Sequence, residues 1–89
     1  MSADLAAKLL TLLTLAEVWL KMGAYCADDL ARAHKDMKDS LDFPRCGVVS
    51  DFYRLVNRAE IWRELADVEE VARCHAEMRA LLEGVTSHG

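Results

Sequence analysis

Apolar side chains recur at alternating steps of four and three through residues 5–37, which is the spacing of one continuous stripe along a helix. The stripe consists of Leu5, Leu9, Leu12, Ala16, Trp19, Gly23, Cys26, Leu30, Ala33 and Met37. Ser2 and Asp4 are favourable at the amino-terminal end of a helix, and Lys35 and Lys38 are favourable at the carboxyl-terminal end, because a cap and complementary charges stabilise the helix dipole. The pattern predicts one long helix over about residues 3–39.

The only proline of the chain is Pro44, and it lies in a segment from Ser40 to Ser50 that also contains Gly47. Proline disfavours helical backbone in the residue before it, so we expect Phe43 to be extended and residues 40–50 to form a hinge. A second, less regular apolar pattern follows, and Gly84 is a typical residue just beyond the end of a helix. We predict a second helix over about residues 51–83, within a single helical domain of residues 1–89.

The first helix carries more apolar side chains than one stripe needs. Leu10, Leu13, Leu15, Val18 and Leu20 extend its apolar surface around most of the circumference. A helix that is apolar nearly all round is normally buried on several sides, but a two-helix hairpin covers only one. The predicted fold is therefore all-α, a hairpin of two long antiparallel helices that pairs with a second copy into a four-helix-bundle homodimer.

The same surplus predicts a face for protein interaction and dimerisation. Aromatic side chains near the middle of the first helix and around the hinge are further candidates, because aromatic residues are favoured anchors at interfaces. The predicted interaction residues are Leu5, Leu9, Leu10, Leu12, Leu13, Leu20, Tyr25, Phe43, Phe52 and Tyr53. For Phe43 and Phe52, a plug that closes the end of the hairpin is an alternative and slightly favoured role.

Two parts of the chain resemble each other. The tetrapeptide Ala16–Trp19 (AEVW) recurs as Ala59–Trp62 (AEIW) at an offset of 43, and ARAHKDMK from Ala31 recurs as ARCHAEMR at an offset of 41. In continuous helices this two-residue difference rotates one motif by about 200° relative to the other, so the copies would not be equivalent throughout. Duplication of a helix and chance both remain open. The tryptophan segments are similar to the start of a tetratricopeptide repeat. That family has a period of about 34 residues and an internal turn in each repeat, and the sequence predicts neither here.

Composition and charge limit the possible functions. The chain has 89 residues, of which 53% are apolar and 29% charged, and its formal net charge is −4. Arg45, Arg54, Arg58 and Arg63 form a local basic stretch, but no basic face dominates, so nucleic-acid binding is not expected. The uncharged stretch of residues 9–16 is far shorter than the roughly 20 residues that span a bilayer, so we expect a cytoplasmic protein without a signal peptide or a membrane partner.

No residue pattern predicts catalysis, a cofactor or a metal. Cys26, Cys46 and Cys74 are an odd number of cysteines without a CxxC pair, which favours reduced thiols in a cytosol. His34 and His75 lack the paired spacing of zinc ligands, and Cys74 and His75 are adjacent, so they point about 100° apart on a helix. Glycine-rich phosphate loops, GxSxG and HExxH are missing. We predict a non-enzymatic protein with structural histidines and inert thiols.

These features together predict a small protein-binding regulator. It would be an antagonist or adaptor that binds a larger protein, for example a bacterial transcription regulator, through an apolar helix face. Small anti-activators and phage-encoded inhibitors share this size and layout. A secretion or assembly chaperone and a metal or redox sensor remain as alternatives.

Overall fold

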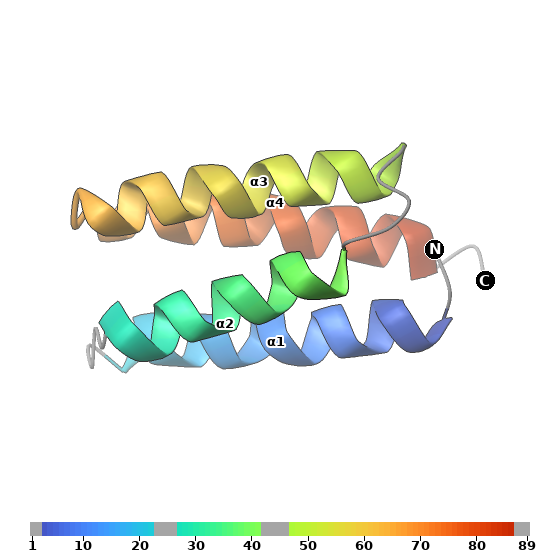
Figure 1. The fold of residues 1–89 in the computed structure, drawn as a ribbon, viewed down its shortest axis with the longest axis horizontal. Coiled ribbons are helices and arrows are strands. Elements are labelled where there is room, and N and C mark those ends of the chain that lie inside the picture. The colour runs from blue at the N-terminus through green and yellow to red at the C-terminus, as the bar shows by residue number, and fades with distance from the viewer. Residues whose placement is uncertain (1–2, 23–26, 42–46, 87–89) are drawn as a thin grey trace.

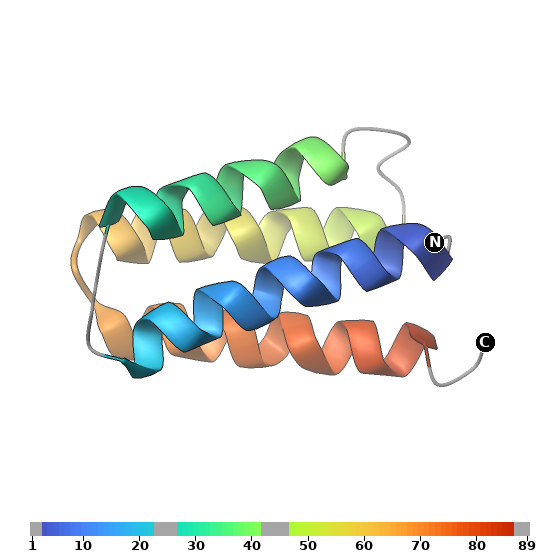
Figure 2. The same cartoon turned by 90° about the horizontal axis from the view of Figure 1, so that it is seen from below.

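The computed structural model describes residues 3–22, 27–41 and 47–86, which fold into four helices and, within these ranges, no strand. The helices are α1 (Ala3–Lys21), α2 (Ala27–Ser40), α3 (Val48–Glu64) and α4 (Val68–Thr86). They run alternately in opposite directions along a bundle of 34 × 20 × 18 Å (Figure 1). α1 packs against α2 and α4, and α3 packs against the same two helices, so the four close a ring (Figure 2).

The all-helical class is confirmed, but the prediction of two long helices is wrong. α1 ends at Lys21 and α2 begins at Ala27, with Gly23 in the interval that lies outside the described residues. The second predicted helix is divided between Glu64 and Val68. Each half of the chain is therefore a hairpin, and the two hairpins cover each other. The missing walls of the bundle, which were expected from a second copy, come from the same chain.

Hydrogen bonds at the turn between α3 and α4 explain the second division. Ala66 has a positive φ of 59°, its N–H donates to the carbonyl of Arg63 at 3.0 Å, and the N–H of Asp67 donates to the carbonyl of Trp62 at 2.9 Å. This is the Schellman pattern, in which a left-handed residue ends a helix. Asp67 Oδ1 accepts a hydrogen bond from the N–H of Glu70 at 3.2 Å and so caps α4. Asp67 and Glu70 have the spacing of a capping box, a start signal that the stripe analysis did not use.

The internal resemblance is also a resemblance in structure. An offset of 43 relates the end of α1 at Lys21 to the end of α3 at Glu64, and an offset of 41 relates the starts of α2 and α4 at Ala27 and Val68. The two-residue difference thus falls in the connections between helices. The rotation that was expected for continuous helices does not arise, because in each half of the chain one helix ends before the second motif begins.

Core positions follow the same offsets. The buried residues Leu30, Ala33, His34, Met37 and Leu41 of the first hairpin correspond to the buried Val71, Cys74, His75, Met78 and Leu82 of the second. Two inter-helix ion pairs also correspond, since Glu17 of α1 pairs with Arg79 of α4 and Glu60 of α3 pairs with Lys38 of α2. The hairpins are therefore related by an approximate two-fold axis, and the contact between His34 and His75 lies on it.

The rest of the core is apolar and draws on every helix. Its largest fully buried members besides the histidines are Leu9, Leu13, Leu30, Met37, Leu41, Phe52, Val56, Val71, Met78 and Leu82. In α1 the buried stripe is Ala6, Leu9, Leu13 and Ala16, which shares only two positions with the predicted stripe. Among the described helices, none is both long and apolar enough to cross a membrane.

Candidate functional site on the outer face of α1

α1 is apolar on two opposite faces. Its inner face supplies the buried stripe to the core, while Leu10, Leu15, Val18 and Met22 are exposed. At about 100° per residue, Val18 and Met22 lie on the side of the helix opposite Leu13. The surplus of apolar residues in the first twenty positions is therefore divided between the core and an outer row. We refer to Ala3, Asp4, Ala7, Leu10, Thr11, Thr14, Leu15, Val18, Lys21 and Met22, all exposed, as the outer face of α1.

The two threonine hydroxyls in the middle of this face donate within the helix, and Thr14 Oγ1 also accepts a hydrogen bond from Arg79 Nη2 of α4 at 3.3 Å. The hydroxyl of Thr11 donates to the carbonyl of Ala7 at 3.0 Å, and the hydroxyl of Thr14 donates to the carbonyl of Leu10 at 2.8 Å. Each threonine has therefore already used its hydroxyl proton, so covering the face leaves no hydroxyl donor unpaired. A shallow depression of about 300 Å³, lined by Leu10, Thr11, Thr14 and Leu15, lies in this part of the face.

The symmetry-related helix does not carry an equivalent face along its whole length. Val18 and Met22 correspond to Ile61 of α3 and to Leu65 directly after it, and all four are exposed, by 44%, 72%, 56% and 66% respectively. Farther from that end of the bundle, Thr11 and Leu15 correspond to Arg54 and Arg58, which are exposed cations. The outer face of α1 therefore carries no charged residue of its own between Lys8 and Lys21, whereas the corresponding part of α3 carries two cations.

The predicted interaction residues are distributed over several environments. Leu9, Leu13 and Phe52 are fully buried in the core of the single chain, so they are not part of its surface. The residues Leu5, Leu12, Leu20 and Tyr53 are partly buried against the core, and Leu10 is exposed. Tyr25 and Phe43 lie outside the described residues. Leu15 and Val18 belong to the surplus recognised in the sequence, but the stripe alone did not separate them from inward-facing leucines.

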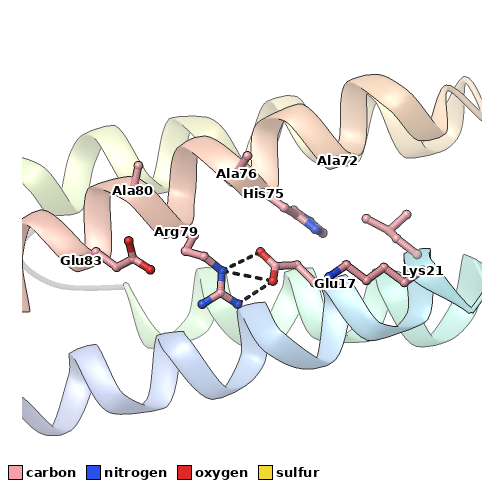
Figure 3. A pocket seen from close by; sticks show the side chains of 9 residues that line it. Glu17, Lys21, Ala72, His75, Ala76, Arg79, Ala80 and Glu83 are labelled. Carbon is pink, nitrogen blue, oxygen red and sulfur yellow. Dashed lines mark hydrogen bonds and ion pairs between the residues drawn. The ribbon is translucent and has the colours of Figure 1, made fainter.

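A second concave feature lies between α1 and α4. It has a volume of about 350 Å³ and is lined by Glu17, Leu20, Lys21, Ala72, His75, Ala76, Arg79, Ala80 and Glu83. Figure 3 shows Arg79 and Glu17 pointing toward each other across it, with Arg79 Nε 3.1 Å from each carboxylate oxygen. The hydrogen bond to Glu17 raises the pKa of Arg79. This ion pair fixes α1 to α4, and its charges are matched within the chain.

The two buried histidines form a pair at the centre of the bundle. His34 Nε2 and His75 Nε2 are 2.9 Å apart, so one ring donates an N–H to the other, and the rings meet edge to face. Both Nδ1 atoms are buried and have no hydrogen-bond partner among the described residues. Burial, followed by the charges of His75, Arg63 and Lys38, lowers the pKa of His34 to about 3. Burial lowers the pKa of His75 to about 4, against an opposing effect of Glu17.

Cysteine and metal chemistry find little support in the described part of the chain. Cys74 is buried, and this burial raises the pKa of its thiol, which disfavours the reactive thiolate. Cys26 and Cys46 lie outside the described residues. Within residues 3–22, 27–41 and 47–86, no group of three or more histidine, cysteine, aspartate or glutamate side chains could hold a metal ion.

Comparison with known proteins adds no relative. No protein-family model, no curated protein and no solved structure matches this chain.

Proposed function

We propose that the protein is a non-enzymatic binding protein, an antagonist or adaptor that binds a larger protein through the outer face of α1. One observation carries this proposal. Three large apolar side chains of α1, Leu10, Leu15 and Val18, and that of Met22 directly after it are exposed, although the chain already forms an apolar core from all four helices. A contiguous exposed apolar row on a folded chain is typical of a surface that a partner covers.

The partner that fits this face is an amphipathic helix. Its apolar residues, spaced by three and four, would lie along the outer face of α1, and one of them would enter the depression beside Leu10 and Leu15. The face has no charge between Lys8 and Lys21, so the contacting side of the partner helix would be apolar as well. A transcription regulator that presents such a helix is the example we favour, with the bound protein blocking that helix from its usual contacts.

The internal two-fold relation supplies a matched pair of variants for the test. Val18→Glu and Ile61→Glu place the same charge at corresponding exposed positions of α1 and α3. Both substitutions are on the surface, so each should change the free energy of unfolding by about 0.5 kcal/mol or less. Circular dichroism of the two variants would check that the fold is retained.

Affinity capture from the source cells, followed by mass spectrometry, then measures binding. We expect wild-type protein and Ile61→Glu to retain the same folded partner, and Val18→Glu to lose most of it. Equal capture by Val18→Glu would contradict a role for the outer face. Capture of exported or unfolded clients in place of a folded regulator would favour a chaperone instead.

The homodimer predicted from the sequence is not needed to complete the bundle, because one chain supplies all four helices. A homodimer remains a proposal because the outer face of α1 can be covered either by a different protein or by a second copy of this chain.

A further inference from the structure

Large and small side chains are unevenly distributed along the outer face of α1. Its amino-terminal part presents the small residues Ala3 and Ala7, and its carboxyl-terminal part presents the large residues Val18 and Met22. A face of this kind does not match itself when two copies run in parallel, because large residues meet large and small residues meet small. It matches itself when one copy is reversed.

We propose that the outer face of α1 binds the same face of a second copy of this chain, with the two helices antiparallel and centred at the level of residues 12 and 13. In this register Met22 lies at the level of Ala3 of the second copy, and Val18 lies at the level of Ala7. Leu15 lies at the level of Leu10, beside the depression that Leu10 lines. Each contact occurs twice, as in any isologous interface. The proposal rests on the outer face being a binding face, as the proposed function also requires.

The charges of the face agree with this arrangement. Asp4 is the acidic residue of the first turn of α1, and Lys21 is the basic residue of its last turn. In the proposed register, Asp4 lies at the level of Lys21 of the second copy at both ends of the interface. In a parallel pair, Asp4 would lie beside Asp4 of the second copy and Lys21 beside its Lys21. The repulsion between these like charges is unfavourable. Antiparallel helices also place opposite ends of their dipoles together.

Burying the middle of the face requires little desolvation. Thr11 of each copy lies at the level of Thr14 of the other copy. The hydroxyls of both residues already donate to carbonyls of their own helix. α1 itself contributes no charged side chain to this face between Lys8 and Lys21, and the guanidinium of Arg79, which reaches Thr14 from α4, is paired with Glu17. A helix of 19 residues is about 28 Å long, so the interface is small, and a dissociation constant on the order of 10 µM is expected.

Sedimentation velocity of the full-length protein under reducing conditions tests the association. We expect a monomer–dimer equilibrium in which Leu15→Glu raises the dissociation constant at least tenfold, because it places a carboxylate beside Leu10 of the second copy. Ile61→Glu, at an exposed apolar position of α3, should leave the constant unchanged. A protein that stays monomeric to about 500 µM, or a dimer that Leu15→Glu leaves intact, overturns the proposal.

Charge reversal tests the orientation. Asp4→Lys and Lys21→Glu should each weaken the dimer, and the double variant should restore it toward the wild-type dissociation constant. In a parallel pair the single reversals would have no effect, because like charges would still face like charges. A carbodiimide cross-link between Asp4 and Lys21 should also form only between copies, because the two residues are about 25 Å apart along one helix.

These outcomes separate the dimer from the proposed function. A monomeric protein that still captures a folded partner through Val18 removes the dimer alone. A dimer with the expected responses but no specific partner removes the proposed function alone. If both hold, the two ligands use one face, and adding the partner should dissociate the dimer.

Discussion

The contact between His34 and His75 makes the stability of the bundle depend on pH. In the folded state the pKa of His34 is lowered to about 3 and that of His75 to about 4, from the ordinary value of 6.5. The unfolded chain therefore binds protons at both positions at a higher pH than the folded chain does. The stability that the two neutral histidines contribute is fully present above about pH 6.5. It is lost as the pH falls from there toward the two lowered pKa values.

The size of this effect can be worked out from the pKa shifts. One pKa unit corresponds to about 1.4 kcal/mol, so lowering the pH from 6.5 to 4 removes stability on the order of 3 kcal/mol through each histidine. The two contributions do not simply add, because the rings are in contact and a charge on one opposes a charge on the other. The total stability of a domain of this length is about 4–13 kcal/mol. We therefore expect the bundle to lose a large part of its stability as the pH falls from 6.5 to 4.

Urea denaturation followed by circular dichroism at about pH 7, 6, 5 and 4 measures this loss. The control is the double variant His34→Leu/His75→Leu. Its side chains at these two positions are similar in size to histidine, do not titrate and have no buried Nδ1 atoms. We expect it to fold and to show a much smaller loss of stability over this pH range. The single variant His34→Leu leaves His75 buried without its hydrogen bond, and should be about 1–3 kcal/mol less stable than the double variant at pH 7.

Two results would refute this reasoning. The free energy of unfolding of the wild-type protein could remain constant between pH 7 and pH 4, in which case the histidines are not held in their neutral form by burial. Alternatively, the double variant could lose as much stability as the wild type. The acid sensitivity would then come from groups other than these two histidines.

Two further predictions concern the packing and the turn. Leu13→Ala should lower the free energy of unfolding by about 2–5 kcal/mol because Leu13 is fully buried, whereas Leu15→Ala should change it by about 0.5 kcal/mol or less; equal effects in urea denaturation would contradict the assignment of the two faces of α1. Ala66→Gly should raise the free energy of unfolding by about 1 kcal/mol, because glycine adopts the left-handed conformation at this position without the strain of a Cβ atom; a lower midpoint in the same assay would argue against the Schellman turn.

Helical periodicity was sufficient to predict the all-α class but not the number of helices. The division at Ala66 was missed because the left-handed position carries alanine in place of the usual glycine, so it has no local signal of its own. The capping box of Asp67 and Glu70 was available in the sequence and would have located the start of α4. A helix that continues through a pattern of steps of three and four cannot be distinguished by that pattern from two helices joined by a turn.

For a related reason, the sequence did not show which leucines of α1 face the core and which lie on its outer face. Leu12 and Leu13 are adjacent, and both fit a stripe through Leu9, so periodicity alone does not decide which one faces the core. The structure buries Leu13 completely and Leu12 only partly, because α2 and α4 approach α1 from particular sides. The His34–His75 contact was not predicted either, because the matching places of the two residues in the ARAH and ARCH segments do not by themselves bring the side chains together.

The approximate two-fold relation between the hairpins has a consequence for how the protein responds to its own abundance. Two hairpins on separate chains would have to meet by diffusion, but here one polypeptide joins them, which gives each hairpin an effective concentration of the other on the millimolar scale. The ring of four helices therefore persists at any dilution. Any contact that the outer face of α1 makes with another molecule would be bimolecular and would depend on the amount of protein in the cell. The association between the hairpins is then constant, whereas the proposed association through α1 would change with the expression level.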